Sequence, residues 1–339
     1  MSSPIMNVVP VSFQWPTLDP FLFCVYHDDK YPRGNDVMGP DASLEGRHIG
    51  QDFAGKDGWR MYHGDVVPGF PKHPHRGFET ITLVRKGRID HSDSLGATAR
   101  FGGGDVQWMT AGRGIEHCEM FPLLSRDEEN PLELFQIWLN LPASDKMVDP
   151  YFTMLWNHEI PRRTYEDSNG IGTELVSIVG SLDGQEAPPP PPNSWASRDE
   201  SGMAIWTIRI PPGGRFTLPE GPWGTNRVAY LFKGKTLSVA GRSLAPEVGI
   251  QLHPTMPTEL VNGEEEAELL VLQARPIGEP VARRGPFVMN TQGEIRQAYA
   301  DYHAGTFGRW PWDSLGPVHD RGQERFAIHA DGRREVPPA

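Results

Sequence analysis

The stretch HPHRGFETITLV, residues 73–84, decides the fold, because two histidines one residue apart lead directly into a run of β-branched side chains. A second signature, HCE at residues 117–119, follows further along the chain. Side chains alternate between the two faces of a strand, so the two histidines of the first signature share a face, as do the histidine and glutamate of the second. Two such strands side by side in a small barrel would bring these groups into one interior. The pattern predicts a metal site with open coordination positions, whose candidate ligands are His73, His75, His117 and Glu119.

Short β-prone runs recur along the whole chain, and 37 glycines and 33 prolines separate them with turns. Three of the clearest runs are TITLV, AIWTI and ELLVL, at residues 80–84, 204–208 and 268–272. Closely spaced short strands suit a closed barrel better than an open sheet, because closure removes exposed strand edges. With 339 residues the chain is long enough for two such domains. We therefore expect an all-β protein built from two β-barrels.

A weak internal repeat supports the duplication. LVRKG at residues 83–87 is echoed by LFKG at residues 231–234. The steps that lead back from Gly87 to the two histidines lead from the glycine of the second copy to Glu220 and Pro222, which cannot replace that ligand pair. The second barrel is thus expected to have no metal site.

Composition suggests where the domains begin and end. The first domain is predicted at residues 1–145, with a Gly- and Asp-rich insertion at about 32–69 that we expect to cover the site. The second domain is predicted at residues 146–310. It includes a helix at about 291–304, because TQGE at its start has the form of a capping box and apolar residues follow at helical spacing. Residues 311–339 are polar and are expected to form a tail that lies over a barrel or stays loose.

The charge balance excludes some classes of partner. The chain has 32 basic and 44 acidic residues and a net charge of −12, which argues against direct binding to nucleic acid or to an anionic membrane.

We find no secretory signal and no membrane-spanning run of about 20 apolar residues. Only Cys24 and Cys118 are available for a disulfide, and neither lies in a cysteine-rich framework. A cytoplasmic protein is therefore expected.

The identity of the oxygen ligand stays open at this point. Glu79 shares strand parity with His73 and His75, so the register alone does not choose between Glu79 and Glu119. A set of three nitrogens and one oxygen without thiolate accepts Fe, Mn, Co, Ni, Cu or Zn. His63 and His91 are further histidines of this region, and we expect them at the surface or behind the ligands.

Several residues next to the signatures are candidates for supporting roles. We expect Arg76 and Gln107 to orient the ligands through hydrogen bonds. Trp108 and Met109 are expected either to line the pocket or to form ordinary core. Cys118 lies between two candidate ligands but points the other way by strand parity, so it is expected to be a buried, inert thiol.

Longer motifs carry a family resemblance. HPHRGFET at 73–80, GDVQWMTAGRGIEHCEM at 104–120 and GPFVMNT at 285–291 resemble the pirin family of the cupin superfamily, and so do LDPFL at 18–22 and KMVDP at 146–150. The resemblance spans residues 15 to 305 approximately. The long insertion before the first histidines and the tail after Arg309 depart from the family pattern.

This resemblance implies a fold and a metal. It implies two stacked cupin barrels, a bicupin, in a monomer. It also implies Fe(II) in the first barrel, although other divalent first-row metals fit the same ligands. The metal ligands would be His73, His75, His117 and Glu119, with Glu79 behind them.

The same resemblance implies two alternative functions. The first is a quercetin 2,3-dioxygenase activity on a flavonol with O2, in which Glu119 would act as the catalytic base. The second is an iron-binding, redox-sensitive protein that regulates a partner, either a transcription factor or a metabolic enzyme. A pirin of a eukaryote would be nuclear as well as cytoplasmic.

Overall fold

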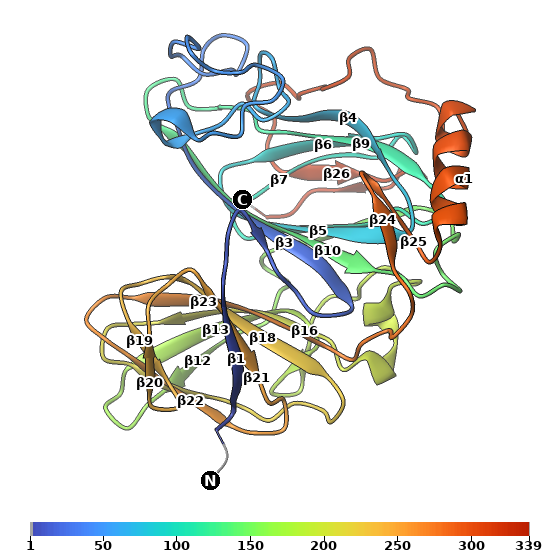
Figure 1. Cartoon of the computed structure of the whole chain (residues 1–339). Coiled ribbons are helices and arrows are strands. Elements are labelled where there is room, and N and C mark those ends of the chain that lie inside the picture. Colours follow the sequence, from blue (N-terminus) through green and yellow to red (C-terminus); the bar gives the residue numbers. More distant parts are fainter. Residues whose placement is uncertain (1–2, 339) are drawn as a thin grey trace. The chain divides into compact units, whose positions relative to one another are not determined.

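A computed structural model describes residues 3–338, and its contacts divide them into two compact units. We call the first the histidine domain; it comprises Tyr26–Ile137, Leu141–His158 and the residues from Glu279 onward. We call the other the second domain; it comprises the residues up to Val25, Trp138–Asn140 and Glu159–Gly278. Both consist mainly of β-strands (Figure 1). Within the described residues, no helix is long and apolar enough to cross a membrane.

Two six-stranded sheets surround the histidines. In spatial order, the first contains β27 (Arg334–Glu335), β26 (Phe326–Ile328), β7 (Thr98–Phe101), β6 (Ile89–Asp93), β9 (Ile115–Met120) and β4 (Gly69–His75). The second contains β11 (Tyr151–Leu155), β8 (Val106–Thr110), β5 (Phe78–Lys86), β10 (Asn130–Asn140), β3 (Phe21–Tyr31) and β2 (Gln14–Trp15). One buried cluster joins Ile89 and Phe101 of the first sheet to Val84 and Leu134 of the second. The two sheets therefore pack face to face around an apolar core.

The second domain repeats this plan with a seven-stranded and a four-stranded sheet. The larger sheet is ordered β1 (Ile5–Pro10), β21 (Val248–Leu252), β18 (Asn226–Lys233), β23 (Ala267–Ala274), β16 (Ala204–Ile210), β13 (Gly172–Val179) and β12 (Arg162–Glu166). The smaller is ordered β17 (Arg215–Leu218), β22 (Thr258–Asn262), β19 (Leu237–Val239) and β20 (Arg242–Leu244). Trp206, Leu231 and Val271 of the larger sheet share one buried cluster with Leu260 of the smaller. The expected all-β protein of two barrels is confirmed.

The remaining elements are short. The second domain also contains β14 (Ser181–Leu182), β15 (Gln185–Glu186) and the 3-10 turns η2 (Trp195–Ser197) and η3 (Asp199–Ser201). The histidine domain also contains η1 (Lys56–Gly58), β24 (Ala282–Arg284), β25 (Phe287–Met289) and α1 (Gln292–His303). Helix α1 begins with the expected capping box, in which Thr291 accepts from the Glu294 amide and Glu294 accepts from the Thr291 amide. The C-terminal helix is thus confirmed.

The domain boundaries differ from those expected. Helix α1 belongs to the histidine domain rather than to the second, because Ile295 and Ala298 are buried against Phe287 and Phe307. The expected tail is not loose, since β26 extends the first sheet by pairing with β7. Conversely, β1 pairs with β21 in the second domain. Because segments far apart in sequence pair with one another, the two domains are not divided at residues 145 and 310 as expected.

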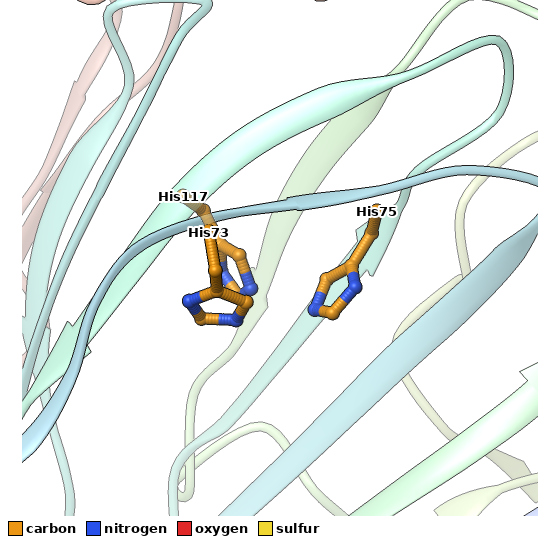
Figure 2. A group of neighbouring side chains, drawn as sticks. All are labelled: His73, His75 and His117. Carbon is orange, nitrogen blue, oxygen red and sulfur yellow. The ribbon is translucent and has the colours of Figure 1, made fainter. Parts of the chain in front are cut away.

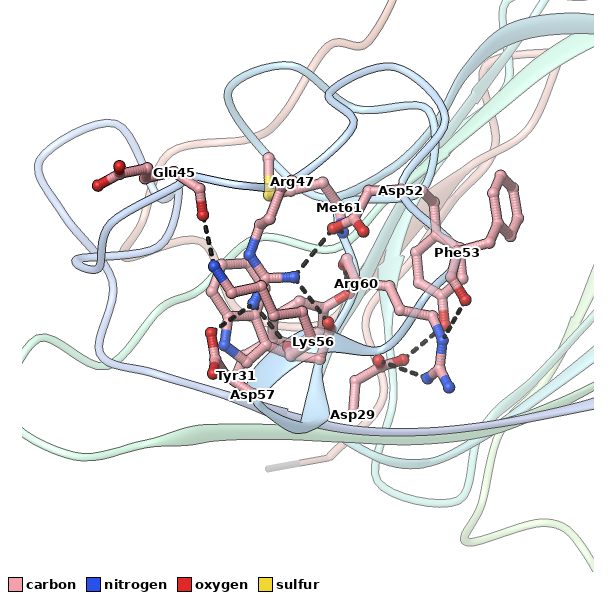
Figure 3. A network of polar contacts seen from close by, with 12 residues as sticks. Asp29, Tyr31, Glu45, Arg47, Asp52, Phe53, Lys56, Asp57, Arg60 and Met61 are labelled. Atoms are coloured by element: carbon pink, nitrogen blue, oxygen red, sulfur yellow. Dashed lines mark hydrogen bonds and ion pairs between the residues drawn. The ribbon is translucent and has the colours of Figure 1, made fainter.

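Polar contacts order the insertion at residues 32–69 (Figure 3). The guanidinium of Arg47 lies 3.2 Å from the centre of the Trp59 ring and donates to Asp52 at 2.9 Å and to the Lys56 carbonyl at 2.7 Å. A second cluster ties the insertion to β3, where Arg60 donates to Asp29 at 3.0 Å. Buried ion pairs therefore hold the insertion in place in addition to strand pairing.

Candidate metal centre

The candidate ligands come from β4 and β9, which are antiparallel neighbours. His73 lies opposite His117 in their register, after an irregularity that follows Phe70. His75 is two residues further along β4 and shares a face with His73. The three rings project from the two strands to the same side (Figure 2), and their ligand nitrogens all lie within 4.8 Å of one another. Three imidazoles gathered in this way form a ligand set for one first-row metal ion.

Burial keeps these imidazoles neutral. It lowers the pKa of His73 to about 4 and the pKa values of His75 and His117 well below the ordinary histidine value, and the neighbouring imidazoles of the cluster lower the last two further. Neutral imidazole is the form that binds a metal. The Nδ1 of His73 is 2.9 Å from the Pro71 carbonyl oxygen, to which it can donate, so that Nε2 carries the lone pair. The protein thus presents ligands that are already deprotonated.

His117 gives the clearest sign of a missing partner. Its side chain is fully buried, and neither ring nitrogen has a hydrogen-bond partner among the described residues. An unsatisfied buried polar group costs about 1–3 kcal/mol, and a metal ion would remove that cost for one of the two nitrogens. The residues present therefore fit a metal.

Glu119 lies outside the three-histidine group. Its carboxylate accepts a hydrogen bond from Thr82 at 2.9 Å and another from Gln136 at 2.7 Å. Burial raises the pKa of Glu119, and these two hydrogen bonds oppose that rise. Its predicted role as the fourth ligand stays a prediction. Neither Thr82 nor Gln136 was expected at the site, because Thr82 has the opposite strand parity to His73 and His75 and the sequence around Gln136 gives no signal.

His91 is more central than its sequence context suggested. It is fully buried, and its ring centre lies 5.5 Å from that of His117. Its Nδ1 is 3.0 Å from the side-chain amide of Gln107, and its Nε2 is 3.2 Å from Asp93. Gln107 therefore contacts His91 and not a candidate ligand. The surface alternative for His91 is wrong, and its expected position behind the ligands agrees with this contact.

Glu79 and Trp108 face away from the histidines. β4 ends at His75 and β5 begins at Phe78, with a turn between them at Gly77, whose φ is +82°. This turn breaks the parity that related Glu79 to the histidines. On β5 the side chain of Thr82 points to Glu119, so Glu79, three residues earlier, points to the opposite face, where it accepts from Thr110 at 2.6 Å.

The alternation on β8 has the same effect. Trp108 is the neighbour of Gln107, which points to His91, so Trp108 faces the other side of the sheet. The expected pocket roles of Glu79 and Trp108 are corrected accordingly. Met109 shares the face of Gln107 and packs in a small apolar cluster with Ala111 and Ile115.

Arg76 anchors the end of β4 instead of orienting a ligand. Its guanidinium donates to the Arg113 carbonyl at 2.6 Å and to Asp301 of α1 at 2.7 Å, and it lies 4.6 Å from the centre of the Phe307 ring. Because Arg76 directly follows His75, these contacts fix the backbone that carries one candidate ligand. Its expected role as a hydrogen-bond partner of the ligands is therefore replaced by this indirect one.

The insertion contributes aromatic side chains next to His73. His75 and His117 are buried, whereas His73 keeps part of its surface exposed. The Phe70 ring lies 6.3 Å from the His73 ring and 5.6 Å from the His63 ring, and Phe53 lies 5.1 Å from His63. His73, the partly exposed member of the cluster, thus adjoins a series of aromatic rings, which we call the aromatic wall and which comes partly from the insertion.

Two β-barrels, one of which gathers three histidines on neighbouring strands, define a bicupin with a candidate metal centre in one barrel. Residues 5–139 match the model of the family described as Pirin, and residues 205–308 match that of the Pirin C-terminal cupin domain. The chain belongs to the pirin family, and the resemblance of its motifs is confirmed.

Several relatives illustrate the range of the family. A Pseudomonas aeruginosa protein named provisionally as a quercetin 2,3-dioxygenase is 36% identical over 241 residues, which cover 71% of this chain and 80% of that protein. Pirin of Homo sapiens is 34% identical over 246 residues, or 71% of this chain and 78% of pirin. A crystal structure of a quercetin 2,3-dioxygenase from Acinetobacter baumannii superposes with a TM-score of 0.70 at 25% identity and covers 91% of this chain and 99% of that one.

Proposed function

We propose that this protein is a pirin-type, iron-dependent dioxygenase that opens the heterocyclic ring of a flavonol such as quercetin. The observation that carries the proposal is the cluster of three neutral histidines, in which neither buried nitrogen of His117 has a hydrogen-bond partner among the residues that the structure describes. The names of the Pseudomonas and Acinetobacter relatives support the same substrate class. A bound Fe(II) would supply Lewis-acid and redox chemistry toward the substrate and O2.

In this proposal His73, His75 and His117 hold the metal, and the rest of the barrel positions them. The backbone of β4 keeps its shape through the contacts of Arg76, and Gln107 and Asp93 hold His91 against His117. Contacts of this kind fix ring orientation at metal sites, and their loss typically weakens metal binding by about 10- to 100-fold.

Glu119 is the proposed base. A flavonol must lose a hydroxyl proton before its ring becomes electron-rich enough to react with O2, and a carboxylate with a raised pKa is suited to accept that proton. Burial raises the pKa of Glu119 in this way. Thr82 and Gln136 donate to its two different oxygens and so hold the carboxylate in one orientation. The proton would go to a Glu119 oxygen.

The aromatic wall is the proposed contact surface for the substrate. Phe53, His63 and Phe70 form a continuous series of ring contacts that ends at His73. Flat aromatic molecules bind well against such rings, because offset and edge contacts between rings add to burial of apolar area. In this view the insertion borders the approach to the metal and adds to the substrate surface.

The test is oxygen consumption by the full chain loaded with Fe(II), with quercetin as substrate. Oxygen uptake that matches flavonol loss is expected for the wild-type protein. His75→Ala should lose both iron and uptake. His48→Ala is the matched control, since His48 is an exposed histidine of the same domain outside the cluster and should leave both unchanged.

Full iron content without oxygen uptake would contradict the dioxygenase. That result would favour the alternative function, an iron-binding protein that regulates a transcription factor or a metabolic enzyme.

A further inference from the structure

A histidine of the insertion, His63, presents an unused hydrogen-bond acceptor at the surface of the histidine domain. Its side chain is exposed, and its Nδ1 lies 2.7 Å from the Gly50 carbonyl oxygen. A carbonyl oxygen only accepts, so Nδ1 carries the proton and, in the neutral imidazole, the lone pair is left on Nε2. Nε2 has no hydrogen-bond partner among the residues that the structure describes. His63 can therefore accept a hydrogen bond from a bound molecule.

Two aromatic rings hold the imidazole of His63 in this orientation. The ring centres of Phe53 and Phe70 lie 5.1 and 5.6 Å from that of His63, and both rings meet it edge to face, at 71° and 73°. Together with the hydrogen bond to Gly50, these contacts fix the plane of the imidazole and leave Nε2 unengaged. The acceptor is thus preorganised, so a ligand would have to order little of the protein on binding.

His63 lies close to the histidine cluster. The Phe70 ring that contacts His63 also contacts His73, with 6.3 Å between the ring centres. Burial lowers the pKa of His73, and a charge on His63 lowers it further, which places the two imidazoles near one another. None of the four rings is fully buried, since His73 and Phe70 are partly exposed and Phe53 is 38% exposed. Each ring thus keeps surface that a ligand can contact.

The side chains around His63 suit a ring that carries a hydroxyl group. Phe53 is exposed, and Ile49, the residue before Gly50, is 40% exposed. Exposed apolar side chains of this size gain from contact with an aromatic ring. A phenolic hydroxyl can donate to Nε2 of His63, whereas an unsubstituted ring would cover this nitrogen without giving it a hydrogen bond. A single acceptor within the aromatic wall therefore discriminates between the two kinds of ring.

We propose that His63 makes the protein select flavonols with a hydroxyl group on the pendant phenyl ring, by accepting a hydrogen bond from that group at Nε2. This inference rests on the proposed dioxygenase function and adds a substrate preference to it. The pendant ring is joined to the heterocycle by one single bond, so it can turn to lie along the aromatic wall while the heterocycle stays at the histidines. The fused ring of a flavonol has no such freedom.

Anaerobic equilibrium dialysis of the full chain loaded with Fe(II) measures flavonol binding without turnover. Quercetin has two hydroxyl groups on the pendant ring, kaempferol has one and galangin has none, and the three are otherwise identical. We expect galangin to bind about 3- to 10-fold more weakly than the other two, which is the effect of one hydrogen bond. His63→Phe keeps a ring between Phe53 and Phe70 but has no acceptor, so it should bind all three with equal affinity.

Two further variants control for the loss of the imidazole itself. A glutamine can place its amide oxygen near the position of Nε2, so His63→Gln should retain part of the preference for quercetin over galangin. His48 is another exposed histidine of the insertion and lies outside the histidine cluster. His48→Phe should therefore keep the wild-type preference. A melting temperature close to that of the wild type shows that each variant is folded.

Equal affinity of the wild-type protein for the three flavonols would overturn this inference alone. An unchanged preference in folded His63→Phe would do the same, because the discrimination would then come from other residues. If the wild-type protein binds no flavonol at all, the substrate class of the proposed function fails and this inference fails with it. Binding of quercetin by the wild type thus separates the two failures. The same order of preference is expected in kcat/KM for oxygen uptake.

Discussion

At the scale of single residues, burial decides which groups in the histidine domain are charged. His117 is fully buried and neutral, Glu119 has a raised pKa, and Lys146 is buried among carbonyl oxygens. On the surface of the protein each of these groups would have an ordinary pKa. In the interior their protonation depends on what lies within hydrogen-bonding distance.

Variants of two candidate ligands, His117 and Glu119, should differ in whether the loss of activity is accompanied by an equal loss of metal. His117→Ala is expected to remove both the metal and oxygen uptake, because the histidine cluster loses one of its three nitrogens. Glu119→Gln is expected to retain more metal than activity, because the amide cannot accept the proton. Metal per chain by elemental mass spectrometry and oxygen consumption measure the two effects. Equal loss of both in Glu119→Gln would make Glu119 a ligand only.

Glu79→Gln is the control for this pair. Its carboxylate faces away from the histidines and accepts from Thr110. The variant should therefore keep its metal. Loss of metal in Glu79→Gln would show that the assignment of strand faces on β5 is wrong.

Lys146 should give the histidine domain a pH-dependent stability. Its ammonium is 1% exposed and donates to the carbonyls of Gly77 at 2.8 Å and Val288 at 3.2 Å, and burial lowers its pKa from 10.5 to about 8. Between these two pH values the unfolded chain binds the proton more strongly than the folded one. The free energy of unfolding should therefore rise from pH 8 to pH 10.5, by on the order of 2–3 kcal/mol from this group.

Lys146→Met isolates this contribution. Denaturant unfolding of both proteins across that pH range should show a difference between them that changes with pH by the amount above. A constant difference would mean that Lys146 does not titrate in this window. The hydrogen bonds of Lys146 to the Gly77 and Val288 carbonyls also matter for the site, since Gly77 forms the turn directly after Arg76. A Cβ at Gly77 would lie only 2.0 Å from the Val288 carbonyl oxygen.

At the scale of elements, long loops are ordered by a few buried polar groups. The insertion contains no long strand, and its backbone turns depend on Arg47, which bridges Asp52, Trp59 and Lys56. Helix α1 depends in the same way on its capping box and on Asp301, which binds Arg76. Both elements therefore reach the vicinity of the histidines through specific ion pairs.

Arg47→Ala should loosen the insertion without unfolding the domain. It removes the buried partner of Asp52 and the ring contact with Trp59, a type of loss that costs about 3–5 kcal/mol. Limited proteolysis should then cut within residues 44–60 while metal content stays near that of the wild type. Arg33→Ala, which removes a pair with Asp41 that is more than half exposed on both sides, should change cleavage little. Identical cleavage of both variants would contradict this role of Arg47.

At the scale of the whole molecule, the C-terminal segment completes the histidine domain. Arg100 is buried, donates to Asp90 at 2.6 and 2.7 Å, and also donates to the carbonyls of His319, Asp320 and Gln323. The three carbonyls lie more than 200 positions after Arg100 in the sequence. Trp310 and Val318 pack against Cys118 and Met120 on the outer side of β9. The segment thus covers the back of the strand that carries His117.

Arg100→Met should release this segment. It would remove the guanidinium that pairs with Asp90, which keeps the His319 amide as a donor, and would leave three carbonyl oxygens without that donor. The resulting destabilisation of about 3–5 kcal/mol should uncover Cys118. Reaction with a thiol reagent, with the labelled cysteine identified by mass spectrometry, should be faster at Cys118 than in the wild type. Arg113→Met removes an exposed pair with Asp149 and should have no such effect. An unreactive Cys118 in Arg100→Met would show that other contacts hold the segment.

The sequence predicted the histidine cluster correctly for a physical reason. Alternation along a strand is set by local backbone geometry, so His73 and His75 had to share a face wherever the strand packed. The same argument failed for Glu79, because the left-handed turn at Gly77 interrupts the strand and resets the parity. It also gave no access to Gln136, whose hydrogen bond to Glu119 depends on the packing of β10 against the site.

The sequence by itself determined the all-β architecture, the three histidines and membership of the pirin family, because these depend on strand periodicity and on short contiguous motifs. Only the tertiary structure decided that α1 and the C-terminal segment belong to the histidine domain and that Glu119 is held by Thr82 and Gln136. Each of these features depends on which segments, distant in sequence, pack together and exclude water. Local sequence does not encode that choice, since burial and partner are properties of the packed chain.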